Sequence, residues 1–296
     1  MNLRNPSVLV VMSLFNPSED LFFSIDSVIA QSYKNLKLLI VIDGFIDKGL
    51  FERLKITASK STKIILQSHS VNKGLTNRLE EAVQAASEKL IARIDAGDVW
   101  YPQKLSKQVQ KMSKNSSLIV LGTQVAYRIN GENMGESHFP LKKHEIMQWA
   151  KKNRGMMEHS SIIFKKEKLN YRKFFRYAQD FDLYLRAMKL GEIENISETL
   201  VETQIKLDGI SFKKRILQEK FQQIALENYN TGGNLPKKPP KVSTLSNIFW
   251  SISLPFYTRY VFESHKNGRN LRASFFLALA CAINFQLLLV YIRKLK

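Results

Sequence analysis

The chain has 296 residues, of which 44% are hydrophobic and 10% aromatic. These proportions allow a substantial core in one large domain or in a domain with an appendage. The single cysteine, Cys281, excludes a disulfide framework and a cysteine-based metal site. The short apolar run before Glu19 lacks the cleavage site of a signal peptide, so we expect the front of the chain to stay in the cytoplasm.

The net charge of +19 favours an anionic partner, either nucleic acid or a membrane surface. From Phe212 onward the chain has 14 Lys and Arg against 3 Asp and Glu, so 11 of the 19 net charges lie in this part. They flank apolar segments and do not form an RNA-binding signature. We therefore expect an anionic membrane as the partner and no nucleic acid.

Strand and helix patterns alternate in the first part of the chain. Helical spacing of apolar residues predicts helices over residues 19–31 and 73–86. Short continuous apolar runs predict buried strands at residues 8–12, 36–42, 64–66 and 90–94. This alternation predicts an α/β fold with a mostly parallel, doubly wound sheet.

The pattern changes after Pro102. Strands are predicted at residues 118–121, 124–129 and 160–164, with a turn at Asn130 and Gly131. Helices are predicted at residues 103–112, 141–152, 180–189 and 210–229. Gly191 predicts the end of the third of these helices.

The last part of the chain has the composition of a linker followed by two apolar segments. Residues 245–262 are rich in aromatic side chains, and residues 273–292 carry no charge over about the ~20 residues that a membrane span needs. Basic residues on both sides leave a single span and an in-plane or hairpin anchor equally plausible, and a buried helical pair is the alternative. We predict a folded domain over residues 1–230, a linker over 231–244 and a membrane-associating tail over 245–296.

Two carboxylates follow the predicted strand at residues 90–94. Asp95 and Asp98 would lie at its carboxyl end, where open α/β sheets bind ligands. With no Cys or His beside them, they suit Mg²⁺ or Mn²⁺ that keeps open positions for substrate phosphates. The alternative is a turn with a helix cap, which aspartates also favour.

Several motifs together carry a resemblance that covers residues 6–212. They lie at residues 12–16, 24–32, 39–44, 72–77, 94–102 and 178–186. In this order and spacing they resemble the inverting family-2 glycosyltransferases of the GT-A fold, of the bacterial kind that build O-antigen or capsule. The resemblance implies a GT-A-like, mixed and mainly parallel sheet with flanking helices, to which the predicted apolar helical membrane anchor is added.

The resemblance also implies roles for single residues, each of which could instead serve a turn. The implied metal ligands are Asp95 and Asp98, because the second metal aspartate of the family aligns with Gly97. The implied cofactor is Mn²⁺ or Mg²⁺, which the departure at Gly97 leaves unidentified. The implied nucleotide-binding residues are Ser13, Asn16, Asp43, Lys73 and Asp95.

Asp180 matches the general base of the family, which removes the proton of the attacking acceptor hydroxyl. Its alternative role is that of a helix cap, for which Asp182 competes, and Gln179 replaces a usual glutamate. The residues implied near the acceptor or the diphosphate are His159, Arg186 and Lys206. A structural histidine and a solvated lysine are the alternatives.

The expected function is transfer of one sugar from a nucleotide-diphosphate sugar, with UDP as the expected nucleotide, to a polyprenyl-linked glycan. The chain has no Gln-x-x-Arg-Trp motif, which processive relatives carry, so we expect non-processive transfer. The predicted location is the cytoplasmic face of the inner membrane. The alternative is a non-catalytic nucleotide- or glycan-binding module that kept the fold, which Gly97 and Gln179 favour.

Overall fold

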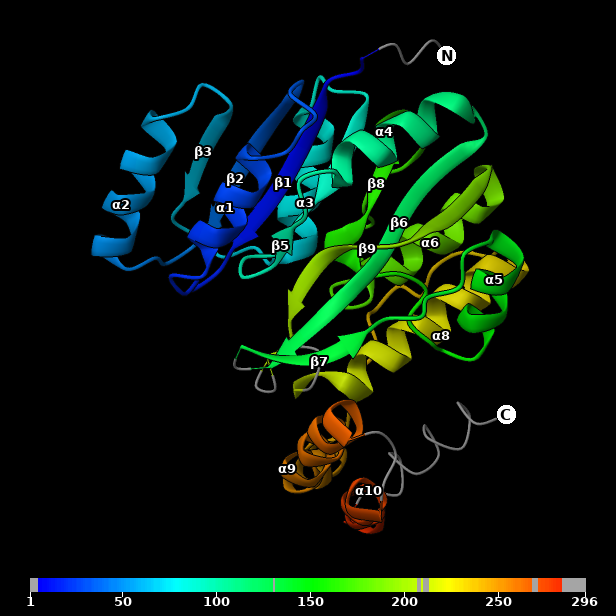
Figure 1. The fold of residues 1–296 in the computed structure, drawn as a ribbon. Coiled ribbons are helices and arrows are strands. Elements are labelled where there is room, and N and C mark those ends of the chain that lie inside the picture. The colour runs from blue at the N-terminus through cyan, green and yellow to red at the C-terminus, as the bar shows by residue number, and fades with distance from the viewer. Residues whose placement is uncertain (1–4, 130, 207–208, 210–212, 268–270, 284–296) are drawn as a thin grey trace.

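A computed structural model describes residues 5–129, 131–206, 209, 213–267 and 271–283. A nine-stranded sheet has the order β3-β2-β1-β4-β8-β6-β9-β5, with β7 paired to β6 (Figure 1). Alternate residues of β1 point to opposite faces of the sheet, so that Val8 and Val10 join one hydrophobic cluster and Leu9 and Val11 the other. The core therefore consists of two layers, one on each face of the sheet.

The parallel half of the sheet holds the four strands that were predicted in the first part of the chain. They are β1 (Val8–Leu14), β2 (Leu36–Asp43), β3 (Ile64–His69) and β4 (Leu90–Arg93). The strand β1 pairs in parallel with β2 on one side and with β4 on the other. The strand order thus reverses between β1 and β4, and open sheets of this kind bind ligands at such a point.

The other half of the sheet is mixed. Its strands are β5 (Val99–Trp100), β6 (Leu118–Ile129), β7 (Glu132–Glu136), β8 (Ile163–Lys165) and β9 (Glu192–Gln204). The strand β8 is antiparallel to β4 and β6, whereas β6 and β9 are parallel.

Two strand predictions in this half were wrong in their bounds. The strands predicted at 118–121 and 124–129 are one strand, β6, whose register against β9 shifts around Gln124. The strand predicted at 160–164 begins with a 3-10 turn, η1 (His159–Ser161), because the Ser161 hydroxyl donates to the Glu158 carbonyl and holds the chain in a turn. The residues of this turn are polar, so they show no apolar pattern from which the turn could have been predicted.

Helices cover both faces of the sheet. On one face lie α1 (Leu21–Ile29), α2 (Lys48–Ser59) and α4 (Lys104–Lys114). On the other face lie α3 (Leu75–Ala85), α5 (Lys143–Lys151), α6 (Gln179–Leu190) and α8 (Arg215–Thr231). The predicted helices are confirmed, except that residues 210–212 of the last lie outside the described part, whereas α2 was not predicted.

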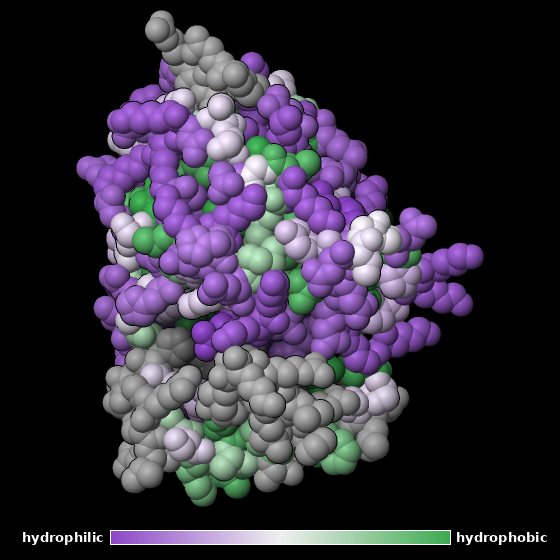
Figure 2. Space-filling model, turned by 90° about the vertical axis from the view of Figure 1, so that its right-hand side faces the viewer, coloured by the Kyte–Doolittle hydropathy of each residue, from purple (hydrophilic) through white to green (hydrophobic). Residues whose placement is uncertain are grey.

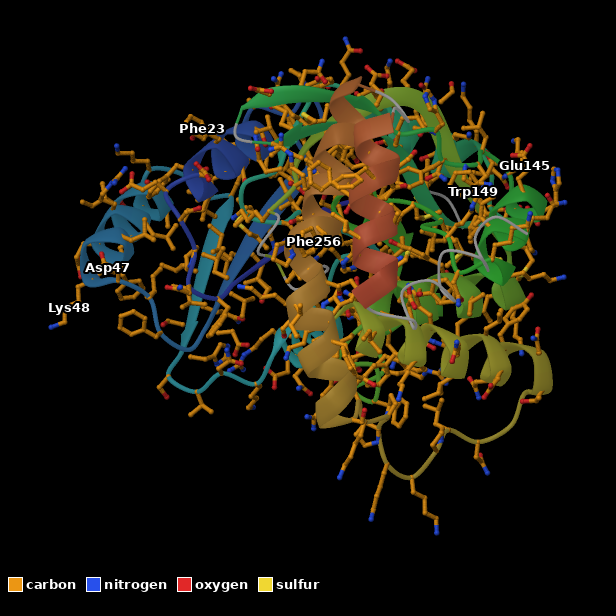
Figure 3. The ribbon with its side chains drawn as sticks, turned by 90° about the horizontal axis from the view of Figure 1, so that it is seen from below. Phe23, Asp47, Lys48, Glu145, Trp149 and Phe256 are labelled. Atoms are coloured by element: carbon orange, nitrogen blue, oxygen red, sulfur yellow. The ribbon has the colours of Figure 1, made fainter. Side chains whose placement is uncertain are left out.

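The C-terminal helices α9 (Thr244–Asn267) and α10 (Leu271–Ile283) pack against each other at one end of the domain (Figures 1 and 3). Trp250 and Ala280 are buried in a small cluster that includes Ile216 of α8. Within the described residues no helix is long and apolar enough to cross a membrane. The predicted membrane span thus finds no support in α10, and its remaining residues, 284–292, lie outside the described part of the chain.

Candidate active site

The carboxyl ends of three parallel strands place the predicted nucleotide-binding residues along one edge of the sheet. Ser13 lies near the end of β1 and Asn16 just beyond it, while Asp43 is the last residue of β2. Asp95 follows β4 by two residues. The structure therefore brings Ser13, Asp43 and Asp95 to neighbouring strand ends, on both sides of the point where the strand order reverses.

Asp43 has an evident structural function. Its side chain is only 2% exposed and forms an ion pair with Arg78, whose Nε lies 2.6 Å from Oδ1. The backbone N–H groups of Lys73 and Gly74 donate to the same carboxylate, at 2.9 and 2.8 Å. Asp43 thus ties the loop before α3 to the end of β2, whereas a contact between Asp43 and a nucleotide stays a prediction.

Residues 95–98 form a tight turn. The backbone N–H of Asp98 donates to the carbonyl of Asp95 at 3.1 Å. Gly97 has a φ of +102°, which side chains disfavour and glycine tolerates. The Gly97 N–H donates to the Ser24 hydroxyl at 2.9 Å, so α1 holds the turn in place.

The two aspartates of this turn differ in their surroundings. The Asp95 side chain is 46% exposed and pairs with the Arg93 guanidinium. Partial burial raises the pKa of the Asp95 carboxyl, but the charges of Arg93 and Lys206 outweigh it and hold the pKa below its usual value. Asp98 is buried, and burial together with the charge of Asp95 raises its pKa to about 7.

These residues fit a divalent metal poorly. Hard cations need several oxygen ligands, but one oxygen of Asp98 already accepts the Gln204 N–H at 3.1 Å, and Gly97 supplies no side chain. Asp95 remains, and it is already paired with Arg93. No group of three His, Cys, Asp or Glu that could hold a metal occurs among the residues that the structure describes. The role of Asp95 and Asp98 as metal ligands therefore stays a prediction.

Asp180 lies in the first turn of α6 and is not its cap. The N-cap is Ala178, a non-glycine residue in the left-handed region with a φ of 61°, so the alternative role of Asp180 as a cap is wrong. Asp182 does not cap the helix either, because it is buried in ion pairs with Arg172 and Arg186. Burial and the charge of Asp95 raise the pKa of the Asp180 carboxyl, although backbone hydrogen bonds oppose this.

Asp180 and Asp95 belong to one cluster of ionisable groups, in which Asp98 and His159 are buried and Asp95, Glu158 and Asp180 are partly exposed. Glu158 is close enough to Asp98, Asp95 and Asp180 that their charges, added to burial, raise its pKa to about 8. His159 is buried with its Nε2 at 2.9 Å from the Tyr171 hydroxyl. Because burial and the charge of Arg93 lower the pKa of His159 to about 3, its imidazole is neutral.

Of the remaining predicted residues, Arg186 and Lys73 are engaged in ion pairs, whereas Lys206 is exposed. The Arg186 guanidinium is occupied by Asp182 at 3.0 Å and by Asn170, so it braces α6. The Lys73 ammonium lies 3.0 Å from Glu81. Lys206 is exposed at the turn, where its Nζ is 3.8 Å from the place of a Cβ on Gly97.

Three residues of this cluster were not predicted, namely Arg93, Glu158 and Tyr171. A signal existed for Arg93, because it is a charged residue inside the apolar run of β4. It is fully buried, and its guanidinium donates to the backbone carbonyl of Val11 at 3.2 Å. Glu158 and Tyr171 lie outside any regular strand or helix, and nothing in their local sequence indicates that they belong to this cluster.

Comparisons with known proteins identify the family and the fold of the chain. The model of the family described as Glycosyl transferase family 2 matches residues 9–172. WfgD of Escherichia coli, a UDP-Glc:alpha-D-GlcNAc-diphosphoundecaprenol beta-1,3-glucosyltransferase, is 26% identical over 265 residues, which cover 88% of this chain and 98% of that protein.

Two solved structures share the fold. The mannosyltransferase PcManGT of Pyrobaculum calidifontis, in complex with GDP-Man and Mn²⁺, has a TM-score of 0.60 at 13% identity and covers 98% of this chain and 87% of its own. TarS of S. aureus in complex with UDP has a TM-score of 0.57 at 11% identity, covering 97% and 88%. The fold is therefore GT-A-like, and the chain belongs to glycosyltransferase family 2 and is a glycosyltransferase.

Proposed function

We propose that the protein transfers one sugar, with inversion, from a UDP-sugar to a lipid-linked glycan during synthesis of a surface polysaccharide. The observation that carries this proposal is the cluster that joins Asp95 and Asp180, which are far apart in the sequence. UDP as the nucleotide and a diphosphoundecaprenol-linked acceptor are named for the relative WfgD, and UDP is bound in the TarS structure.

The donor would lie along the edge formed by the ends of β1, β2 and β4. Ser13 and Asn16 would contact the nucleotide, with Asp43 and Lys73 shaping the loop on its far side. Asp95 would lie near the diphosphate. A divalent metal stays an expectation from the family, and the proposed roles of Asp95 and Asp180 do not depend on one.

Asp180 would serve as the base on the acceptor side. Its carboxylate takes the proton of the acceptor hydroxyl as that oxygen bonds to the anomeric carbon, while the nucleoside diphosphate leaves with the electrons of the broken bond. Burial raises the pKa of Asp180, and a higher pKa makes a carboxylate a stronger base. Holding both substrates in line supplies much of the remaining rate.

Asp180→Asn tests this role. We expect it to lower the rate of sugar transfer about 10²- to 10⁴-fold, the usual contribution of a positioned base. The assay follows release of UDP from UDP-glucose with synthetic GlcNAc-diphospho-lipid, and slow transfer to water from a panel of UDP-sugars. UDP binding, measured by calorimetry, should persist in the variant.

The matched control is Asp26→Asn, an exposed aspartate of α1, which should keep full activity. Unchanged transfer by Asp180→Asn would clear Asp180 of a catalytic role. A wild-type protein that binds UDP but transfers no sugar to lipid or water would favour the rival function, a non-catalytic module with the same fold.

The C-terminal helices support a membrane-associated location, which we expect on the cytoplasmic face. Phe249 and Ile252 of α9 and Phe275 of α10 expose 42%, 51% and 59% of their surface. Figure 2 shows hydrophobic side chains gathered at the end of the molecule where α9 and α10 lie, below a mostly hydrophilic body. Helices that lie in the membrane interface bind through such an apolar face, and nearby basic residues add attraction to anionic lipid.

Co-sedimentation with phosphatidylglycerol vesicles tests this location. The triple variant Phe249→Ser, Ile252→Ser and Phe275→Ser should lose most of its vesicle binding. Ile56→Ser, at an equally exposed apolar side chain of α2, should lose none. Equal sedimentation of all three proteins would refute an anchor in these helices.

A further inference from the structure

The turn at residues 95–98 has no acidic side chain at position 97, because this residue is glycine, and Lys206 lies beside it. A Cβ on Gly97 would lie 3.8 Å from Nζ and 3.9 Å from Cε of Lys206. A carboxylate extending from this position would meet the lysine ammonium. The chain thus has a positive charge beside the position where its family has a metal-binding aspartate.

The position of Lys206 is fixed by the neighbouring strand. The strand β9 pairs with β5, where Trp100 lies opposite Val201. The Gln204 N–H donates to Asp98 at 3.1 Å, and the Ile205 N–H donates to the Arg128 carbonyl at 2.8 Å. Lys206 comes directly after these two anchored residues, so its backbone is held against the turn.

Asp98 therefore has a clear function in this arrangement. Because it is buried and accepts the Gln204 N–H, its carboxylate joins the turn to the end of β9. A metal at the turn would have to compete for this bond. The same bond that engages Asp98 places Lys206 above Gly97.

The charges at the turn favour an anionic ligand without a metal. Arg93 pairs with Asp95, and the charge of Lys206 also acts on Asp95. The other carboxylate of the turn, Asp98, is buried and accepts the Gln204 N–H, so it is directed to the end of β9. Arg93 is buried and its charge is balanced by Asp95. The ammonium of Lys206 is exposed and can therefore bind the ligand. Lysine binds phosphate as a compact point charge.

We propose that Lys206 binds the donor diphosphate in place of a divalent ion, so that nucleotide binding is independent of metal. The inference rests on the proposed function, because it concerns the donor of the same site. As the bond between the sugar and the diphosphate breaks, negative charge develops on the departing phosphate oxygen. The Lys206 ammonium stabilises this charge, the acceptor oxygen takes the sugar, and Asp180 takes the acceptor proton.

The test is calorimetric titration of the full-length protein with UDP and with GDP, once in EDTA and once in Mn²⁺. We expect one nucleotide to bind in EDTA, with a Kd that Mn²⁺ changes less than about twofold. Lys206→Ala should weaken this binding about tenfold or more, since hydrogen bonds to charged groups contribute this much. Lys206→Arg should bind within a few-fold of the wild type.

The matched control is Lys60→Ala, at an exposed lysine where α2 ends, which should bind like the wild type. Binding only in Mn²⁺, or unchanged binding by Lys206→Ala in EDTA, would overturn the role of Lys206 and leave the proposed function standing. Failure of UDP and GDP to bind in either buffer would count against the proposed function, and the inference would fall with it.

Discussion

Asp43→Asn perturbs one of the most buried ion pairs of the protein. Asp43 is 2% exposed and its partner Arg78 is 1% exposed, with 2.6 Å between Oδ1 and Nε. The carboxylate also accepts the N–H groups of Lys73 and Gly74. Asparagine has nearly the same shape but no charge, and its amide nitrogen would face one of these donors.

The expected loss is about 3–5 kcal/mol in the free energy of unfolding. Removing one partner of a buried ion pair has up to this effect, because the remaining buried charge loses a partner. Arg78 would keep only its second ion pair, with the partly exposed Glu81 at 2.7 Å. The usual free energy of unfolding of a domain is about 5–15 kcal/mol, so the variant should still fold. Its unfolding midpoint should lie at a much lower urea concentration than that of the wild type. The loop before α3 should also become more mobile, because Asp43 holds its backbone N–H groups.

The assay is urea unfolding of Asp43→Asn, Arg78→Met and the double variant, followed by circular dichroism. Because the double variant leaves no unpaired charge at the pair itself, its loss should be clearly smaller than the sum of the two single losses. A loss below about 1 kcal/mol for Asp43→Asn would refute the reasoning. It would mean that the loop does not depend on this carboxylate, which would then be available to a nucleotide.

Two further predictions concern buried positions. Burial holds the pKa of Lys104, which lies over the Trp100 ring, well below its ordinary 10.5. The unfolded chain then binds the extra proton, so as pH rises toward 10.5 the stability of the wild type should increase relative to Lys104→Met, by at most about 1.4 kcal/mol per pH unit. Parallel stability curves would show that Lys104 is charged when folded. Gly191→Ala would put a Cβ 2.4 Å from the Ser117 carbonyl, and urea unfolding should show a loss of about 1–3 kcal/mol. Gly155→Ala, whose Cβ has an ordinary 3.7 Å contact, should lose little, and equal losses would contradict the clash.

The parallel half of the sheet was predictable because its strands are buried on both faces. Continuous apolar runs such as Val8–Leu14 carry that signal in the sequence itself. The strand β9 (Glu192–Gln204) was not predicted, because four glutamates interrupt it and its partners β6 and β5 come from distant parts of the chain. The helix α2 was missed for a related reason, since it buries only Leu50 and Leu54 and shows a weak apolar stripe.

Individual residues of the site could be predicted from the sequence, but the charged neighbours of each residue could not. Family resemblance identified Asp95 and Asp180, and the structure brings both into one cluster. The sequence could not indicate that Glu158 lies among the same carboxylates, because that proximity depends on how the turn η1 packs on β4 and β6. Nor could it show that Arg186 is occupied by Asp182, one helical turn away.

The unpredicted strand β9 also explains why Asp95 and Asp98 looked equivalent in the sequence. Spacing alone puts both carboxylates at a strand end, where either could face a ligand. The end of β9 decides between them, because its Gln204 N–H engages Asp98 and leaves Asp95 half exposed. The same contact sets Lys206 beside Gly97. An acidic side chain at position 97 would pair with the Lys206 ammonium and neutralise it, so the glycine at this position keeps the positive charge of Lys206 available to an anion.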